Sequence, residues 1–199
     1  MNNTAAVAAL SAVLALAAAR AADSSLAAAT PGTYKVDPTH TQVSFSISHF
    51  GFTNYYGLFS GATGMLQFDP GHLRASKLEV AIPIDSVTTT AATLTEQLKG
   101  DKWFDTGKFP QATFVSTQVE PESDGALVTG DLTLHGITKP VVLHVRFIGA
   151  GVNPIEKAYT VGFEATGAIN RGDFGITAYL PALGNEVRLR IAGAFERQN

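Results

Sequence analysis

The chain contains no cysteine among its 199 residues. This absence excludes disulfide bonds, thiolate-bound zinc, iron–sulfur clusters, covalently attached c-type haem and a cysteine nucleophile. It also excludes anchoring through a lipid-modified cysteine at the N-terminus. Stability and any binding site must therefore come from packing, hydrogen bonds and nitrogen or oxygen groups.

Charged side chains are also scarce. They make up 16% of the residues, against roughly 25% in typical globular chains, whereas 45% of the residues are hydrophobic. Such a composition excludes an acidic disordered chain. The net charge of −3 argues against a nucleic-acid partner, which would require a basic patch. At about 150 residues per domain, one domain is expected.

Motifs that carry catalysis are missing. The sequence has no Gly-x-Ser-x-Gly, no glycine-rich phosphate loop, no EF-hand loop and no HExxH or HxH pair. The five histidines, at positions 40, 49, 72, 135 and 144, do not have the spacing of a metal site. We therefore expect no catalytic residue, no metal and no required cofactor, and we expect that the protein is not an enzyme.

One long apolar run is present, at the N-terminus. Residues 5–19 are small and apolar without interruption, which suits the apolar region of a signal peptide and falls short of the ~20 residues needed to span a bilayer. The four residues before the run contain no Lys or Arg, which is atypical. We expect a signal peptide over 1–29 and an exported domain over 30–199, with a membrane anchor as the alternative. Possible cleavage sites follow Ala19, Ala22 and Ala29.

Beyond the leader, apolar and polar residues alternate, which is typical of strands with one buried face. Turn residues separate the strands at short intervals. Pro83 cannot donate to a ladder, so we expect it at an edge, a bulge or a strand end. The pattern predicts an all-β fold, either a sandwich or a barrel. The predicted strands cover 43–49, 64–68, 78–84, 111–119, 126–135, 139–148, 159–169 and 187–195.

A single helix interrupts the strands. Residues 93–96 have the spacing of a capping box, Leu94 and Leu98 share a helical face, and Gly100 can end the helix. Two large aromatics follow at 103 and 104. We expect this helix to pack over one end of the sheet.

The sequence also leads to predictions for individual residues with polar groups. Asp37 lies three residues before His40 and is expected to lock a turn. His49 falls on an apolar face, where it is either a hydrogen-bonded interior histidine or a haem or metal ligand. Tyr55 and Tyr56 are predicted to lie in a loop, where an exposed aromatic pair is hard to explain as core.

Several segments, in order along the chain, resemble the YceI-like family of bacterial periplasmic proteins. Each segment is weakly specific alone, and together they span nearly all of residues 33–197. They are 34–40 (YKVDPTH), 48–51 (SHFG), 57–59 (GLF), 64–70 (GMLQFDP), 103–105 (WFD), 109–114 (FPQATF), 130–136 (GDLTLHG), 138–140 (TKP) and 170–175 (NRGDFG).

The resemblance implies an eight-stranded, lipocalin-like antiparallel β-barrel with the short helix capping one end. It also implies an elongated apolar interior that holds a long-chain polyisoprenoid or a related amphiphile such as a quinone. A periplasmic location is implied as well, in agreement with the leader. Family members are not established enzymes.

Alternation along the strands then predicts which residues line the interior. The predicted lining is Phe45, Ile47, Leu66, Phe68, Val80, Ile82, Phe114, Leu132, Leu134, Leu143, Val145, Phe163, Ile169 and Leu189, with His49 on the same apolar face. The predicted mouth or lid is Tyr55, Tyr56, Phe59, Leu94, Leu98 and Trp103.

Arg171 has two possible roles. Its guanidinium could bind an anionic head group, or it could pair with a carboxylate such as Asp173 to fix a turn.

Three functions follow as hypotheses. The first is a periplasmic carrier or store for a polyprenyl lipid or quinone. The second is a redox accessory that presents quinone to a membrane b-type cytochrome. The third is a haem-binding barrel that uses His49. A homodimer is compatible with each of them.

Overall fold

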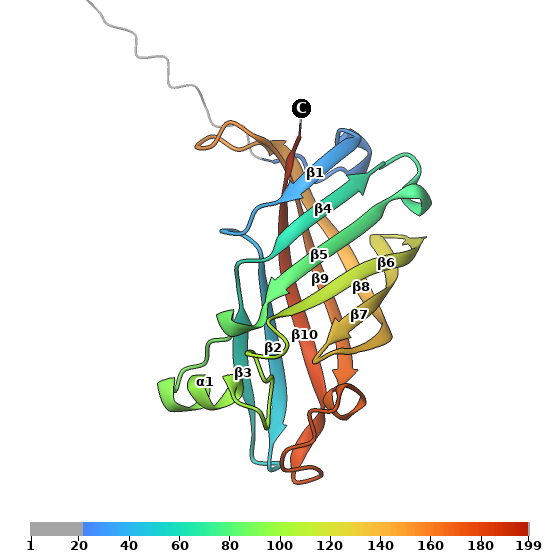
Figure 1. Ribbon diagram of the computed structural model, residues 1–199. Helices are drawn as coiled ribbons and strands as arrows, with labels where there is room; N and C mark the ends of the chain where they lie inside the picture. Colours follow the sequence, from blue (N-terminus) through green and yellow to red (C-terminus); the bar gives the residue numbers. More distant parts are fainter. Residues whose placement is uncertain (1–21, 199) are drawn as a thin grey trace, which may run out of the picture.

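The computed structural model describes residues 22–198, and these form ten strand segments and one short α-helix (Figure 1). The predicted leader lies, as far as residue 21, outside the described residues. Within the described part, no helix is long and apolar enough to cross a bilayer. The elements are β1 (Gly32–Val36), β2 (Gln42–His49), β3 (Thr53–Phe59), β4 (Thr63–Phe68), β5 (Lys77–Pro83), α1 (Ala92–Lys99), β6 (Gln111–Glu122), β7 (Gly125–Leu134), β8 (Ile137–Val152), β9 (Tyr159–Asn170) and β10 (Leu183–Arg197).

All the strands belong to one antiparallel sheet in the order β1-β4-β5-β6-β7-β8-β9-β10-β2-β3, and pairing of β1 with β10 closes the ring. β1 and β2 are two parts of one interrupted strand, and so are β3 and β4. One long hairpin therefore includes both pairings, that of Val43 with Phe59 between β2 and β3 and that of Lys35 with Met65 between β1 and β4. The ten segments thus build a closed eight-stranded barrel, which confirms the predicted fold.

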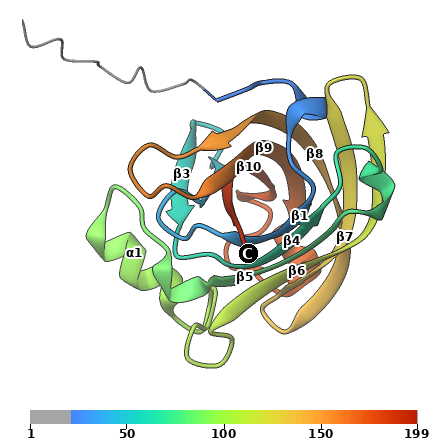
Figure 2. The same ribbon diagram turned by 90° about the horizontal axis from the view of Figure 1, so that it is seen from above.

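β3 is the least enclosed strand of the sheet. It pairs along its length with β2, and its other edge is bridged by hydrogen bonds between Leu58 and Thr88. α1 lies on the outside of the barrel next to this edge (Figures 1 and 2). The helix and the aromatic segment after it therefore cover one side of the barrel near the lower end in Figure 1.

The predicted set of strands was incomplete, because it did not include β1 and β3. Tyr55 and Tyr56 lie within β3 and not in a loop. Pro83 is the last residue of β5, as expected for a residue that cannot donate to a ladder.

The ends of α1 only partly match the predicted ones. The helix ends at Gly100, as predicted, but its N-cap is Ala91 and makes no side-chain cap bond. Thr93 lies inside the first turn, so it cannot cap. Glu96 instead forms an ion pair with Lys99 at 2.9 Å.

Aromatic rings fill the barrel end at which the chain finishes. Phe163 contacts Phe68 and Phe195 edge-to-face, with ring centroids 5.4 and 5.9 Å apart. Tyr34, which has no exposed surface, contacts Phe68 in the same way. Ala29 is also buried in this cluster, which we call the aromatic plug and which lies in the half of the barrel where β1 and the C-terminus are drawn in Figure 1.

The break between β1 and β2 is held by buried polar groups. The Asp37 backbone amide and the Thr41 hydroxyl both donate to the Ala194 carbonyl of β10. The Asp37 carboxylate accepts from the amides of Thr39 and His40, and its other oxygen lies 2.5 Å from Nδ1 of His40. This arrangement confirms the predicted turn lock.

The connection from β9 to β10 is held by Arg171, which is 3% exposed. Its Nε donates to Gly184 O at 2.8 Å, Nη1 to Ile176 O at 2.8 Å and Nη2 to Leu183 O at 3.2 Å. Among the described residues, no carboxylate forms an ion pair with Arg171, so the predicted pairing with Asp173 was wrong. The physical reason is that backbone carbonyls of an irregular loop need donors, and one guanidinium supplies three.

The Asp37–His40 lock should make stability depend on pH. Burial raises the pKa of Asp37, but hydrogen bonds from His40 and the two backbone amides outweigh it and leave the pKa below its ordinary value. The hydrogen bond with Asp37 raises the pKa of His40, and the charges of Asp37, Glu156 and Glu196 raise it further. The contribution of Asp37 is therefore present above its ordinary pKa of about 4 and is lost as the pH falls through its lowered pKa. The contribution of His40 is complete below its ordinary pKa of about 6.5 and is lost as the pH rises through its raised pKa.

Urea unfolding of wild type and His40→Asn between pH 3 and pH 9 measures this dependence. We expect the difference in unfolding free energy to be largest between about pH 4 and pH 6.5. His72→Asn is the control, because His72 and Asp69 form the same motif at 3.1 Å on an exposed turn. A difference that is constant with pH for His40→Asn would show that the Asp37–His40 pair does not make stability depend on pH.

Arg171→Ala should destabilise the barrel. It leaves three carbonyls without their donor, and each buried unsatisfied group costs about 1–3 kcal/mol. We expect a loss of at least about 3 kcal/mol in unfolding free energy, measured by chemical denaturation. Arg188→Ala removes an arginine from an exposed pair on β10 and is expected to change stability by less than about 1 kcal/mol. Equal losses for the two variants would show that the clamp does not hold the connection.

Candidate functional site

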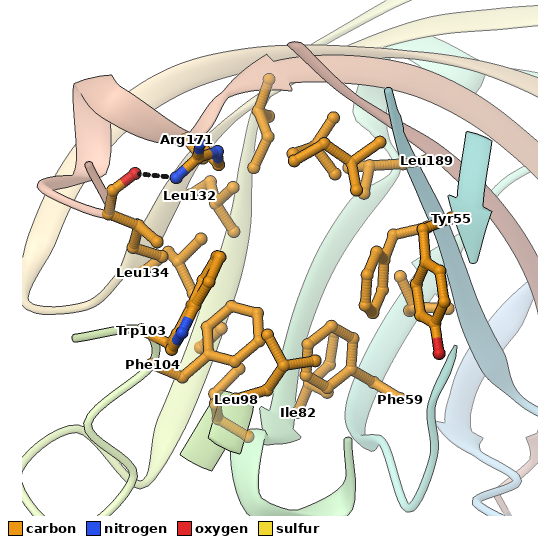
Figure 3. A pocket seen from close by; sticks show the side chains of 18 of the residues that line it. Tyr55, Phe59, Ile82, Leu98, Trp103, Phe104, Leu132, Leu134, Arg171 and Leu189 are labelled. Atoms are coloured by element: carbon orange, nitrogen blue, oxygen red, sulfur yellow. Dashed lines mark hydrogen bonds between the residues drawn. The ribbon is translucent and has the colours of Figure 1, made fainter. Parts of the chain in front are cut away.

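The barrel interior is hollow in two places along its axis. The larger cavity, about 500 Å³, lies in the half near α1, and Figure 3 shows it from close by. The smaller one, about 170 Å³, lies towards the aromatic plug. The larger cavity alone has the size of an ordinary small-molecule site.

Sixteen of the residues predicted to line the interior or its mouth line the larger cavity. They are Phe45, Ile47, His49, Tyr55, Phe59, Ile82, Leu94, Leu98, Trp103, Phe114, Leu132, Leu134, Leu143, Ile169, Arg171 and Leu189.

Five other predicted residues, Leu66, Phe68, Val80, Val145 and Phe163, line the smaller cavity. Ile82, Phe114 and Leu143 line both cavities, as do Val43 and Ile191. These shared side chains form the wall between the two cavities. Together the cavities follow the length of the barrel.

Tyr56, which was predicted to lie at the mouth or lid, faces away from both cavities. It is 63% exposed and lines neither cavity. Since β3 is a strand, successive side chains alternate, and Tyr55 faces the cavity while Tyr56 faces solvent. The error came from treating the two tyrosines as a loop pair.

Sequence reasoning missed twelve residues of the larger cavity. Some lie on the cavity-facing side of predicted strands, so alternation could have found them. Others lie in irregular connections, which have no periodicity to read. The missed residues are Val43, Phe50, Ile84, Gln97, Phe104, Ala112, Val141, Ile176, Tyr179, Leu183, Val187 and Ile191.

Two glycines make room for two phenylalanine rings of the wall. A Cβ at Gly57 would lie 2.2 Å from the ring of Phe45, and one at Gly130 would lie 2.4 Å from the ring of Phe114. Each ring therefore lies flat over a neighbouring strand that has no side chain at that point. This packing keeps the bore open, because the rings fold against the wall.

Six side chains with polar groups line the larger cavity: His49, Tyr55, Gln97, Trp103, Arg171 and Tyr179. Trp103 is 8% exposed, and its Nε1 is buried, so the indole contributes its apolar ring to the wall. The guanidinium of Arg171 lies over this indole ring, 5.6 Å from its centroid. The wall thus contains a buried cation stacked on an aromatic face (Figure 3).

The charge of Arg171 is balanced by carbonyl dipoles and by the indole face, and not by a carboxylate. Burial lowers the pKa of Arg171, but a guanidinium remains protonated in proteins. Because no carboxylate among the described residues pairs with it, the cation of Arg171 favours an electron-rich atom on a molecule bound in this part of the cavity.

The larger cavity opens at the lower barrel end in Figure 1, between the β2–β3 hairpin and the connection after β9. Phe50 and Tyr179 line the cavity and are also 45% and 60% exposed, which places them at its rim. His49 is exposed at the same rim, so its interpretation as an interior histidine was wrong. Its ring contacts Phe50 edge-to-face at 4.5 Å. Haem ligation by His49 stays a prediction.

Comparison with solved structures places this fold among known barrels. The Burkholderia cenocepacia BcnA structure matches with a TM-score of 0.72 at 24% identity, over 80% of this chain and 98% of that one. A Campylobacter jejuni YceI protein matches with a TM-score of 0.66 at 28% identity, over 77% of this chain and 91% of that one. A domain from Saccharophagus degradans, described as polyisoprenoid binding and implicated in plant cell wall breakdown, matches with a TM-score of 0.62 at 16% identity, over 85% of this chain and all of that one.

Sequence comparison gives closer relatives. A UPF0312 protein of Yersinia enterocolitica is 40% identical over 158 residues, which cover 78% of this chain and 82% of the relative. A UPF0312 protein of Yersinia pestis is 41% identical over 158 residues, which again cover 78% of this chain and 82% of the relative. The model of the YceI-like domain matches residues 34–195. Because that match spans the whole barrel, from Tyr34 in the plug to Phe195 in the last strand, the chain belongs to the YceI-like family.

Proposed function

We propose that this protein binds one long-chain isoprenoid lipid or quinone in the barrel and carries or stores it in the periplasm. The observation that carries the proposal is the apolar cavity of about 500 Å³ with a second cavity of about 170 Å³ beyond it on the barrel axis. A long, narrow, apolar interior fits an extended hydrocarbon tail. The polyisoprenoid-binding domain of S. degradans, which has the same fold, supports this assignment.

Burial of the tail supplies enough free energy for tight binding. One five-carbon isoprenyl unit removes about four CH₂ equivalents from water, which is about 3 kcal/mol. A few units offset the association cost of ~4–15 kcal/mol. Apolar contact alone therefore accounts for affinity, and polar groups of the wall set orientation and selectivity.

The tail should point towards the aromatic plug and the polar head towards the mouth. The smaller cavity is lined mainly by apolar side chains, whereas Trp103, Arg171 and Gln97 lie in the larger one. A quinone or alcohol oxygen of the head would lie in the larger cavity, where the cation of Arg171 favours an electron-rich atom. The same groups serve a carrier and a protein that presents quinone to a membrane cytochrome.

Export to the periplasm is part of this proposal and is supported by the apolar run at residues 5–19. Among the three candidate cleavage sites, the packing favours the earlier ones. Asp23 forms two backbone hydrogen bonds with Ala150 of β8, and Ala29 is 5% exposed in the plug. Cleavage after Ala19 or Ala22 keeps both contacts, whereas cleavage after Ala29 removes both.

Native mass spectrometry of protein purified from its own periplasm tests the proposal. We expect one polyprenyl compound or quinone per chain and a mass that identifies the first residue. Leu143→Trp should reduce bound lipid at least tenfold, because Leu143 lies in the wall shared by both cavities. Val142→Trp is the matched control, since Val142 is the next residue and is 46% exposed on the outer face.

A lipid-free mass, with no uptake of added polyprenol or quinone by the folded wild type, would overturn the proposal. Equal retention of lipid by Leu143→Trp and Val142→Trp would show that the ligand lies outside the barrel axis. Circular dichroism of both variants confirms that the barrel is folded.

A further inference from the structure

The end of the barrel at which the cavity opens has an unusual composition. Residues 49–56 (HFGFTNYY), at the β2–β3 hairpin, and residues 174–183 (FGITAYLPAL), before β10, contain no Asp, Glu, Lys or Arg. The two segments lie side by side, because Leu183 pairs with His49 in the ladder between β10 and β2. The lower end in Figure 1 therefore presents two adjacent uncharged loops.

These loops expose aromatic side chains at their tips. Phe52 is 85% exposed and lines neither cavity, while Phe50 and Tyr179 are 45% and 60% exposed at the rim. One exposed apolar residue needs no explanation, but several at one site mark an interaction surface. Phe50 and Gly51 have φ values of 53° and 75°, so a tight turn projects the Phe52 end of the hairpin outwards.

The opposite end of the barrel differs in charge. There the β8–β9 connection contains Glu156 and Lys157, and the β6–β7 turn contains Glu122 and Asp124. Ile155 is also 85% exposed there, next to these charges. Exposure of apolar residues alone therefore does not distinguish the two ends. The combination of aromatic tips, an open cavity and few charges does, since exposed Asp173 is the charged residue that adjoins the two segments.

We propose that the surface formed by residues 49–56 and 174–183 docks on a lipid bilayer, with Phe52, Phe50 and Tyr179 inserted at the level of the head groups. This inference rests on the proposed lipid ligand and adds where that ligand is exchanged. Phenylalanine and tyrosine on short uncharged tips suit the interface of a membrane, where aromatic rings are enriched. A protein partner or a second copy seated on these tips would cover the opening, whereas a bilayer covers the opening and supplies the ligand through it.

Docking on a membrane would speed the uptake of the lipid. An isoprenoid tail that leaves a membrane through water exposes its whole apolar surface, which makes the free lipid extremely rare in solution. If the cavity opens directly on the bilayer, the tail passes from one apolar environment to another. The rate of uptake should therefore rise with vesicle concentration and depend on the tips.

Phe52→Ser provides the test, with Ile155→Ser as the control of equal exposure at the other end. We expect wild type and Ile155→Ser to sediment with sucrose-loaded phosphatidylethanolamine–phosphatidylglycerol vesicles. The fraction of Phe52→Ser that sediments with the vesicles should be at least fivefold lower. Uptake of a fluorescent polyprenol from the same vesicles should slow about tenfold in Phe52→Ser. Its affinity for that polyprenol, measured at equilibrium without vesicles, should be unchanged, because Phe52 does not line the cavities. Phe52→Trp should keep vesicle binding.

The outcomes separate the two proposals. Wild type that binds vesicles without taking up any lipid contradicts the ligand and leaves the docking surface supported. Wild type that takes up lipid at a rate independent of vesicle concentration, or Phe52→Ser that behaves like Ile155→Ser, overturns docking. Loss of a dimer in Phe52→Ser by analytical ultracentrifugation, with no vesicle binding by wild type, would assign the surface to a second copy and overturn it as well.

Discussion

The barrel depends on the last strand, β10. It pairs with β9 along its length on one edge, and on the other it pairs first with β2 and then with β1. One edge of fifteen residues thus holds both parts of the interrupted first strand. The buried lock at Asp37 and Thr41 lies at the exchange point and binds to Ala194 of the same strand. If β10 were lost, the ring would open and β2 and β3 would have no connection to the sheet.

The interruption of the first strand also creates the site. Because β2 follows β10 while β1 pairs with β4, β3 leaves the ring and has a free edge beside α1. Side chains of Leu94, Leu98 and Trp103 close this side where a fully paired strand would otherwise lie. Closure by side chains is looser than closure by a ladder, and it leaves room for the larger cavity. The Arg171 clamp secures the neighbouring connection and brings a cation to the cavity wall, so a residue that holds the fold together also lines the cavity.

Alternation in the sequence was enough to predict most of the lining, because a strand with one buried face has a period of two. It failed at Tyr55 and Tyr56, where a glycine follows and the segment resembles a loop by composition. It failed as well at β1, which is only five residues long. Ile176 and Tyr179 reach the cavity from an irregular connection, and only the three-dimensional position of that connection brings them there. The role of Arg171 as a donor to three carbonyls was likewise hidden, because backbone geometry leaves no trace in side-chain spacing.

The aromatic plug bears on how a lipid of the proposed kind would be exchanged. Tyr34, Phe68, Phe163 and Phe195 cluster near one end of the barrel, whereas Phe50 and Tyr179 line the larger cavity and are exposed. A lipid that entered past Phe50 and Tyr179 with its tail towards the plug would leave head first. The barrel would then have to be emptied before it is refilled, so one molecule would not push the previous one forward. A recipient would meet the polar head before the tail is released, and it would select the lipid by its head while the barrel still shields the rest.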